Sequence, residues 1–190
     1  MKYLAHISED GIREQTVLEH SRNVAELAGK FADRFHAGSW GYCCGMMHDI
    51  GKHSQAFQLR LKGGPAVDHS TAGAKELNRK KGFHALAAYC TAGHHAGLPD
   101  GGEKADSPGA ATLQGRLKKN VPEYGDYQKE IAIPELENPA VKMIGKGGFT
   151  VSFFLRMIYS CLVDADFLDT EQFMNCLLYT SDAADDLIGV

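Results

Sequence analysis

The spacing of apolar positions in the first third of the chain predicts a helix from about Thr16 to about Phe35. Its apolar positions recur at steps of three and four residues, the spacing of one helical face: Val24, Leu27, Phe31 and Phe35. Thr16 and Glu19 have the spacing of a capping box at its start. His20 lies one turn before Val24 on the apolar face, so we expect its side chain to point inward.

Further helices are predicted wherever apolar positions keep this spacing between glycines and prolines. A second helix begins after Ser39 and ends at the segment H-D-I-G-K, where Gly51 suits a left-handed C-terminal turn. The remaining helices are expected at residues 54–61, 68–81, 84–92, 110–119 and 149–167. Because the chain shows neither strand-like alternation nor an internal repeat, the pattern predicts an all-α fold.

The length of 190 residues fits one domain with a short tail, and we predict the domain over residues 1–175. The tail, residues 176–190, contains C-L-L-Y-T-S-D-A-A-D-D, which looks like the translation of a sequencing adapter. We therefore exclude it from the fold prediction and expect that the parent reading frame was cut near Asn175 and continued. An ordinary amphipathic C-terminus is the alternative.

The cysteine content, the apolar segments and the net charge indicate which cellular compartment and which partners to expect. The five cysteines are odd in number and form no C-x-x-C pair, which argues against a zinc ribbon or a disulfide framework. No segment has the apolar length of a signal peptide or a membrane span, so we expect a reducing, cytoplasmic setting and no membrane partner. The net charge of −4 argues against a general nucleic-acid coat, but it is compatible with a nuclease whose metal ions supply positive charge.

The nine histidines supply the candidate chemistry, because several stand beside aspartates or glycines near helix ends. Imidazole and carboxylate together favour transition metals such as Mn, Fe, Co, Ni or Zn over Ca or Mg alone. Taken alone, an inward-pointing histidine such as His20 is more often a core residue than a metal ligand. Taken alone, H-D-I-G-K also fits an ordinary helix C-terminus, where the positive charges of His and Lys interact favourably with the helix dipole. The set as a whole points to a metal site, with these candidates: His20, His48, Asp49, His69, His94, His95 and either Asp164 or Asp166.

Three local patterns carry this interpretation. His48 and Asp49 are adjacent at a helix end, where both side chains can reach one cation and the carboxylate can bridge to a second. In D-H-S-T-A-G-A, helix capping explains the aspartate and the serine but not His69. In G-H-H-A-G-L-P-D, glycines flank His94 and His95, which places two imidazoles in an uncrowded turn.

The last candidate ligand is one of two aspartates on the final predicted helix. Asp164 and Asp166 are about 200° apart around a helix, so only one can face a given wall. Stepping back from Asp166 gives an apolar stripe, whereas stepping back from Asp164 gives a mixed one. We therefore predict Asp166 as the inward carboxylate, with Asp164 as its possible support.

These motifs together resemble the HD nuclease domain of the CRISPR-associated type I effector nuclease-helicase, over about residues 1–175. The resemblance implies an HD-domain helical bundle with two divalent cations, transition metals such as Mn, Fe, Co or Ni, with Mg an option. One cation would be held by His20, His48, Asp49 and Asp166, and the other by Asp49, His69, His94 and His95. Asp49 and Lys52 would be the catalytic residues, with Lys52 contacting the scissile phosphate.

The resemblance also implies a substrate and partners. The family cleaves single-stranded DNA, by endonuclease or exonuclease action in antiviral defence, which a fused or partner helicase delivers after a guide-RNA surveillance complex opens the target. No P-loop motif is present, so the helicase would be a separate subunit or a part of the parent chain beyond this one. The basic patches 60–62, 79–81 and 116–119 are candidate guides for DNA, although solvated helix faces explain them equally well.

Two other functions remain open at this point. An HD phosphohydrolase acting on a small nucleotide would turn over nucleotides without cutting DNA, and a closed pocket rather than an open groove would favour it. A non-catalytic module that kept a structural metal is the weakest alternative, because catalysis needs an open coordination position and a structural site does not.

Overall fold

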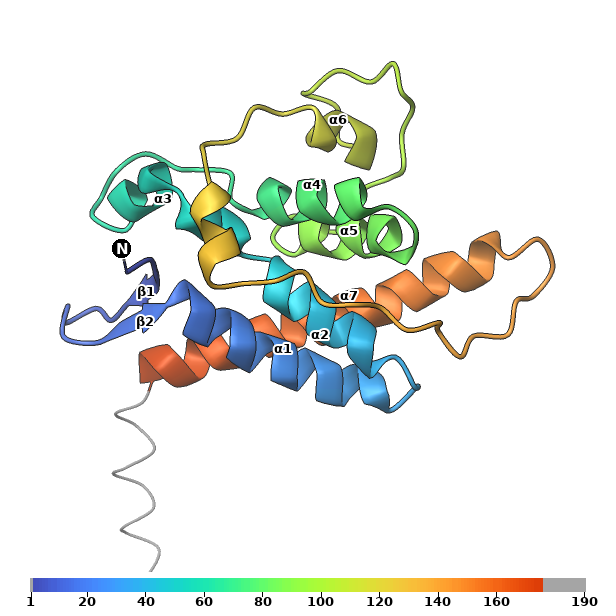
Figure 1. Ribbon diagram of the computed structural model, residues 1–190, viewed down its shortest axis with the longest axis horizontal. Helices are drawn as coiled ribbons and strands as arrows, with labels where there is room; N and C mark the ends of the chain where they lie inside the picture. The colour runs from blue at the N-terminus through green and yellow to red at the C-terminus, as the bar shows by residue number, and fades with distance from the viewer. Residues whose placement is uncertain (1, 176–190) are drawn as a thin grey trace, which may run out of the picture.

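The computed structural model describes residues 2–175, which fold into a helical bundle with one small sheet (Figure 1). Helix α1 pairs with α2 and α4 with α5, while the long helix α7 packs against α1, α2 and α5. The elements are β1 (Leu4–Ile7), β2 (Glu14–Thr16), α1 (Val17–Asp33), α2 (Gly38–Met47), η1 (Ile50–His53), α3 (Gln55–Arg60), α4 (Ser70–Lys80), α5 (Phe83–Gly93), α6 (Leu113–Leu117), η2 (Gly125–Lys129) and α7 (Gly148–Asn175). The predicted all-α class is confirmed.

The C-terminal tail lies outside the residues that the structure describes. The adapter-like segment, residues 176–190, lies beyond the described residues, so its origin and the domain boundary at 175 stay predictions. Within residues 2–175, every helix is too short or too polar to cross a membrane.

The start of α1 is the capping box that the sequence predicts. Thr16 Oγ1 accepts a hydrogen bond from the backbone N–H of Glu19 at 3.1 Å, and Glu19 Oε2 accepts one from the backbone N–H of Thr16 at 2.8 Å. These two bonds satisfy donors that a helix N-terminus otherwise leaves unpaired. The helix ends at Asp33, two residues before the predicted end at Phe35.

Helices α1 and α2 approach closely because small residues face each other. A Cβ added to Gly41 would collide with the carbonyl of Ala28, and one added to Gly45 would collide with the backbone of Ala25. The larger residues of the predicted apolar stripe are partly buried and pack against the core: Leu27, Phe31 and Phe35. Close packing of backbones therefore fixes the end of α2, with the site residues that follow it, against α1.

The turn after α2 differs from its prediction. Gly51 does not adopt the left-handed conformation expected of a helix C-terminal glycine, and it lies inside the 3₁₀ helix η1. A Cβ at this position would overlap with the backbone carbonyl of His69. Glycine is therefore required here because η1 packs directly on the start of α4, which brings two candidate ligand segments together.

The sequence-based prediction of no strands was wrong for the N-terminus. Strands β1 and β2 pair antiparallel, with His6 opposite Gln15 and Leu4 opposite Thr16. The register is irregular between Leu4 and His6, and the strands span only four and three residues. Such short strands carry too few alternating positions to be recognised from their pattern.

The other predicted helices are present with shifted ends. Helices α3, α4, α5 and α6 fall within or close to the predicted ranges, and the Asp68 carboxylate caps α4 by accepting from the backbone N–H of Thr71 at 3.1 Å. Helix α7 continues to Asn175, eight residues past the predicted end at Phe167. The additional two turns carry Asp169, whose carboxylate contacts His20.

Candidate metal centre

His20 lies fully buried on α1 and faces three carboxylates. Its Nδ1 lies 2.6 Å from Asp169 Oδ2, so this nitrogen donates its proton to that carboxylate. Its Nε2 faces the opposite way, 3.2 Å from Asp166 Oδ1 and 3.4 Å from Asp49 Oδ2. With Nδ1 protonated, the neutral imidazole leaves the lone pair of Nε2 available on the side of Asp49 and Asp166.

His48 and Asp49 reach the same point from the junction of α2 and η1. His48 Nδ1 donates to the carbonyl oxygen of Gly45 at 2.7 Å, and its Nε2 lies 3.3 Å from His20 Nε2. Asp49 is only 1% exposed, and its Oδ2 lies 3.4 Å from the Nε2 atom of each of these two histidines. The helix end therefore directs both adjacent side chains into one cluster, as their sequence positions suggest.

The second half of the cluster comes from the start of α4 and the end of α5. His94 Nδ1 donates to the carbonyl oxygen of Thr91 at 2.8 Å, and its Nε2 lies 3.5 Å from Asp49 Oδ1. His69 Nε2 lies 3.4 Å from the same oxygen and 2.8 Å from His95 Nε2. Two imidazoles from two helix ends thus lie beside one oxygen of Asp49, and His95 lies next to His69.

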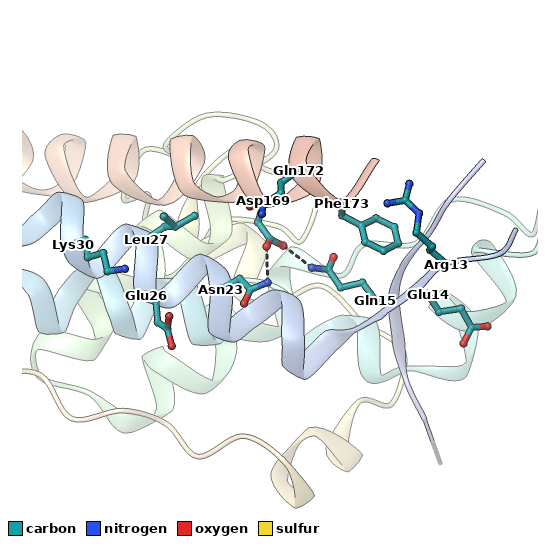
Figure 2. Close-up of a pocket in the computed structure, with 10 residues that line it drawn as sticks. All are labelled: Arg13, Glu14, Gln15, Asn23, Glu26, Leu27, Lys30, Asp169, Gln172 and Phe173. Atoms are coloured by element: carbon teal, nitrogen blue, oxygen red, sulfur yellow. Dashed lines mark hydrogen bonds between the residues drawn. The ribbon is translucent and has the colours of Figure 1, made fainter. Parts of the chain in front are cut away.

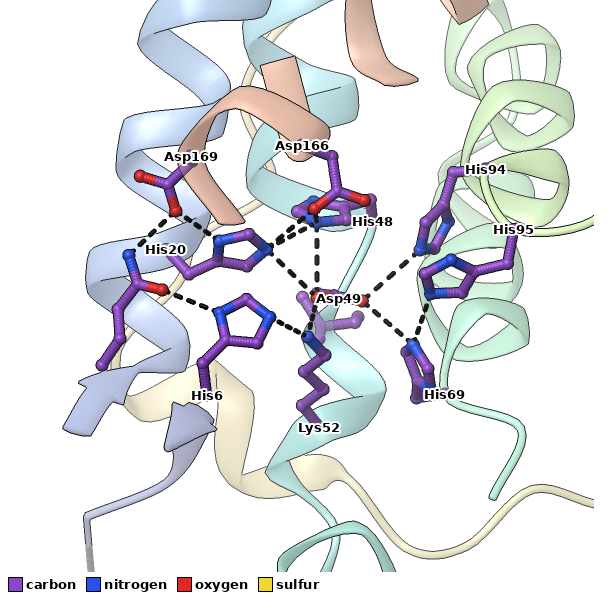
Figure 3. A network of polar contacts seen from close by, with 12 residues as sticks. His6, His20, His48, Asp49, Lys52, His69, His94, His95, Asp166 and Asp169 are labelled. Atoms are coloured by element: carbon purple, nitrogen blue, oxygen red, sulfur yellow. Dashed lines mark hydrogen bonds and ion pairs between the residues drawn. The ribbon is translucent and has the colours of Figure 1, made fainter. Parts of the chain in front are cut away.

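The two oxygens of Asp49 divide the histidines into two groups (Figure 3). Oδ2 faces His20 and His48, whereas Oδ1 faces His69 and His94. A carboxylate placed between two sets of ring nitrogens has the arrangement needed to bridge two cations. Every candidate ligand proposed from the sequence is therefore brought to one place.

The donor set fits divalent cations on geometric grounds. Within residues 2–175, the side chains of Asp49, His69, His94 and His95 can each offer one ligand atom within 4.8 Å of the others. The same holds for two further groups, His20 with His48 and Asp49, and His48 with His94 and Asp166.

Two buried atoms at the centre of the cluster have no hydrogen-bond partner among the described residues, 2–175. They are Asp49 Oδ1 and His94 Nε2, which lie 3.5 Å apart. A buried polar atom left unpaired costs about 1–3 kcal/mol, so native proteins rarely keep one without a compensating interaction. A coordinated cation would satisfy both atoms at once, and the residues present therefore fit a metal centre.

The carboxylates make the His20 half of the cluster strongly attractive to positive charge. Burial disfavours a charged His20, yet hydrogen bonds to Asp166, Asp169 and Asp49 outweigh burial and raise its pKa to about 9. Burial likewise opposes charge on His48, while Asp49 and Asp166 raise its pKa to about 10. In the absence of a metal, protons take the place of cations here, and metal binding would displace them.

The His69 half of the cluster opens toward solvent. His95 is exposed and the His69 side chain is 16% exposed, whereas His94 is buried. Burial lowers the pKa of His69, which favours the neutral, ligand-competent imidazole, although Asp49 opposes this effect. A substrate can therefore approach Asp49 from the side of His69 and His95.

Lys52, the predicted phosphate contact, lies in the same cluster. It is 5% exposed, its Nζ lies 2.6 Å from Asp49 Oδ2, and it sits over the Phe57 ring. Burial raises the pKa of Asp49, but Lys52 and then His48 outweigh burial and hold that pKa well below its ordinary range. The ammonium of Lys52 thus supplies one fixed positive charge beside the candidate bridging carboxylate.

Helix α7 presents Asp166, and not Asp164, to the histidines. Asp164 is exposed to solvent, which removes it as the support for Asp166 that the sequence left possible. Asp169, one turn after Asp166, takes that supporting role through its bond to His20. Sequence reasoning missed Asp169 because the helix was predicted to end at Phe167.

The hairpin contributes two further polar residues that sequence reasoning missed. His6 Nδ1 lies 2.8 Å from Gln15 Oε1, and its Nε2 lies 3.4 Å from Lys52 Nζ. The His6 ring packs edge-on against His20, with ring centroids 4.6 Å apart. Burial, followed by the charge of Lys52, lowers the pKa of His6 to about 4, so this histidine is neutral at physiological pH.

The basic patches proposed as DNA guides are largely engaged within the chain. Arg79 pairs with Glu76, and Lys80 Nζ lies 2.6 Å from Glu135 Oε1. Arg116 donates to the carbonyl oxygen of Ala92. These contacts favour the structural interpretation for the patches at 79–81 and 116–119.

A comparison with known protein families found a match that covers more than half of the chain. The family model described as HD domain matches residues 17–131, a range that runs from α1 past η2. This range contains every candidate ligand except Asp166, and both the hairpin and α7 lie outside it. A search of curated proteins gave no match.

Proposed function

The chain belongs to the HD domain family of metal-dependent phosphohydrolases, and on this premise we propose that it is a nuclease that hydrolyses phosphodiester bonds of single-stranded DNA with two divalent cations. One observation carries the proposal. The two oxygens of the buried Asp49 face different pairs of histidine Nε2 atoms, each at 3.4–3.5 Å.

Hydrogen bonds within the protein preorganise the candidate ligands for metal binding. Hydrogen bonds at Nδ1 hold His20, His48 and His94 with their Nε2 atoms inward, so little reorganisation is needed for coordination. These residues would hold the divalent cations, which would supply an activated water and positive charge for phosphodiester hydrolysis. The proposal assigns one cation to His20, His48, Asp49 and Asp166, and the other to Asp49, His69, His94 and His95.

Lys52 is proposed to contact the scissile phosphate. Its ammonium, 2.6 Å from Asp49 Oδ2, places a fixed positive charge next to the bridging carboxylate. An ammonium is a strong hydrogen-bond donor to phosphate oxygens. When substrate enters, one of its three N–H groups can turn to a phosphate oxygen while another keeps the bond to Asp49.

Two observations support DNA over a small nucleotide. The cluster opens to solvent at His69 and His95, which suits a polymer lying across the surface more than a nucleotide enclosed in a pocket. The motifs resemble those of the CRISPR-associated type I effector nuclease-helicase. On that resemblance we propose a helicase and a guide-RNA surveillance complex as partners.

The proposal is tested by incubating the purified protein with single-stranded circular DNA and Mn²⁺. Wild-type protein should cut the DNA, and Asp49→Ala should abolish cutting because both groups of histidines lose the carboxylate that they share. Asp166→Ala should be strongly impaired, whereas its matched control on the same helix, Asp164→Ala, should cut like wild type.

Two results would contradict this proposal. Undiminished cutting by Asp49→Ala would exclude the site assignment. Turnover of deoxynucleoside triphosphates or cyclic dinucleotides, with no cutting of DNA under the same conditions, would replace the nuclease by an HD phosphohydrolase of small nucleotides.

A further inference from the structure

The hairpin that precedes the matched HD domain carries a pair of buried polar contacts to the metal centre. His6 on β1 and Gln15 on β2 are cross-strand partners, so their side chains lie on one face of the hairpin. That face packs toward His20, Lys52 and Asp169. Neither hairpin residue is a candidate ligand, and both lie before residue 17, where the family match begins.

The direction of each hydrogen bond follows from Asp169, which as a carboxylate can only accept. Gln15 Nε2 donates to Asp169 Oδ2 at 2.8 Å and Asn23 Nδ2 donates to Oδ1 at 2.7 Å (Figure 2). His20 Nδ1 donates to Oδ2 at 2.6 Å. With its NH₂ group turned to Asp169, Gln15 must direct its carbonyl oxygen away, toward His6.

The same donor and acceptor assignments determine which ring nitrogen of His6 carries the proton. They then determine which nitrogen accepts a hydrogen bond from Lys52. Gln15 Oε1, an acceptor, lies 2.8 Å from His6 Nδ1, so this ring nitrogen carries the proton. His6 Nε2 then has a free lone pair and accepts from the Lys52 ammonium at 3.4 Å (Figure 3). A proton on both ring nitrogens would instead set two cations against each other.

The bonds form one path that runs around the His20 side of the centre. It leads from His20 through Asp169, Gln15 and His6 to Lys52, whose ammonium returns to Asp49 Oδ2 at 2.6 Å. Every group on the path has only one role open to it. The path therefore specifies that Nδ1 of His20 carries a proton directed at Asp169, and it specifies the placement of the Lys52 ammonium.

We propose that His6 and Gln15 are positioning residues that hold Lys52 and His20 in their working orientation, which makes the hairpin part of the catalytic unit. The part that concerns Lys52 rests on the proposed function. The tautomer of His6 does not, because it is a property of the metal-free protein. Partners of this kind around metal centres are worth about 10-fold to 100-fold in affinity or activity when removed.

The first test measures the tautomers directly. Long-range ¹H–¹⁵N correlation spectra of metal-free, ¹⁵N-histidine-labelled protein at neutral pH distinguish a ring protonated at Nδ1 from one protonated at Nε2. His6 should be the Nδ1–H tautomer, with His6→Phe used to assign its signals. A His6 ring protonated at Nε2, or at both nitrogens, would overturn the inference whatever the enzyme does.

The second test separates positioning from packing with two substitutions at one position. His6→Phe keeps an aromatic ring against His20 but removes both hydrogen bonds, whereas His6→Gln loses the ring and keeps an acceptor for Lys52. Positioning predicts that kcat for DNA cutting falls by about 10-fold to 100-fold in His6→Phe and recovers in part in His6→Gln. Mn²⁺ content should stay at the wild-type value in both, because neither change removes a candidate ligand or the Asp169 carboxylate that holds His20.

Gln15→Met repeats the test away from His6, since methionine matches the length of glutamine without its donor or its acceptor. Its control is Gln172→Met, at an exposed position of α7. Gln15 and Gln172 both line one pocket, which has a volume of about 620 Å³ (Figure 2). We expect a loss of kcat in Gln15→Met only, with both variants folded at the assay temperature. A His6→Phe protein more active than His6→Gln, or a Gln15→Met protein with wild-type kcat, would overturn the positioning role.

The failures of the two proposals are distinguishable. A wild-type protein that cuts no DNA with Mn²⁺ contradicts the proposed function, while the tautomer of His6 still decides the direction of the path. If the wild-type protein cuts DNA and the His6→Phe and Gln15→Met variants cut it equally well, the positioning role is contradicted. The proposed nuclease function is then unaffected.

Discussion

At the scale of single residues, the carboxylate of Asp169 accepts three hydrogen bonds, and one of them comes from the candidate ligand His20. We predict that Asp169→Asn weakens Mn²⁺ binding by about 10-fold to 100-fold, because an amide no longer offers two charged acceptor oxygens to three donors. Titration calorimetry with Mn²⁺ measures this change, and Asp164→Asn is the matched control. Equal affinities for the two variants would contradict the role given to Asp169.

The sequence pointed to the candidate ligands, which the structure brings together, but not to the residues that orient them. His48, Asp49, His94 and His95 stand in short motifs at helix ends, where neighbouring side chains must share a location. The partners of the ligands are single residues without a motif, and they come from elements with weak patterns. Asp169 lies beyond the predicted end of its helix, and the strand that carries His6 is four residues long.

At the scale of elements, the contact between α1 and α2 depends on glycine at the closest points. We predict that Gly45→Ala destabilises the fold by about 1–3 kcal/mol, because the new Cβ overlaps with the backbone of Ala25 and the helices must separate. Gly148→Ala is the control, since no atom of the part of the chain that the structure describes lies within 4 Å of its added Cβ. Chemical denaturation monitored by circular dichroism compares the two, and an equal midpoint would refute the close contact.

The N-terminus of α1 offers a second element-scale prediction. Thr16→Ala removes the side-chain acceptor for the Glu19 N–H, so the free energy of unfolding should fall by about 1 kcal/mol. The exposed Ser152→Ala on α7 should leave it unchanged. Because α1 carries His20 in its first turn, Thr16→Ala should also raise the Mn²⁺ concentration needed for half-maximal cutting; unchanged stability in Thr16→Ala would contradict the capping box.

The elements that the sequence predicted well are those with local causes. The capping box and the three-and-four spacing are set within a few residues, and α1 appears almost where they place it. The role of Gly51 could not be read locally, because its reason is the backbone of His69, a contact between separate elements. The exposed and buried faces of α7 were predicted correctly, since Leu162 and Ile158 are buried in line with Asp166.

At the scale of the whole molecule, three parts of the chain complete one site: the matched HD region, the hairpin before it and α7 after it. We predict that removing metal lowers the unfolding temperature, because a cation that joins several helices binds only the folded state. At a free Mn²⁺ concentration of one hundred times Kd, the stabilisation is about 2.7 kcal/mol for each site.

Differential scanning calorimetry with and without chelator measures this stabilisation. Asp49→Asn is the comparison, because it should no longer respond to Mn²⁺ while keeping its fold. An unfolding temperature of the wild-type protein that is independent of Mn²⁺ would show that the cluster does not link metal binding to folding.

The central claim is that Asp49 joins two cation sites, and anomalous X-ray diffraction from crystals soaked in Mn²⁺ tests it most directly. Two peaks are predicted, one among His20, His48, Asp49 and Asp166 and one among Asp49, His69, His94 and His95. No peak beside Asp49, or peaks only elsewhere on the molecule, would contradict it.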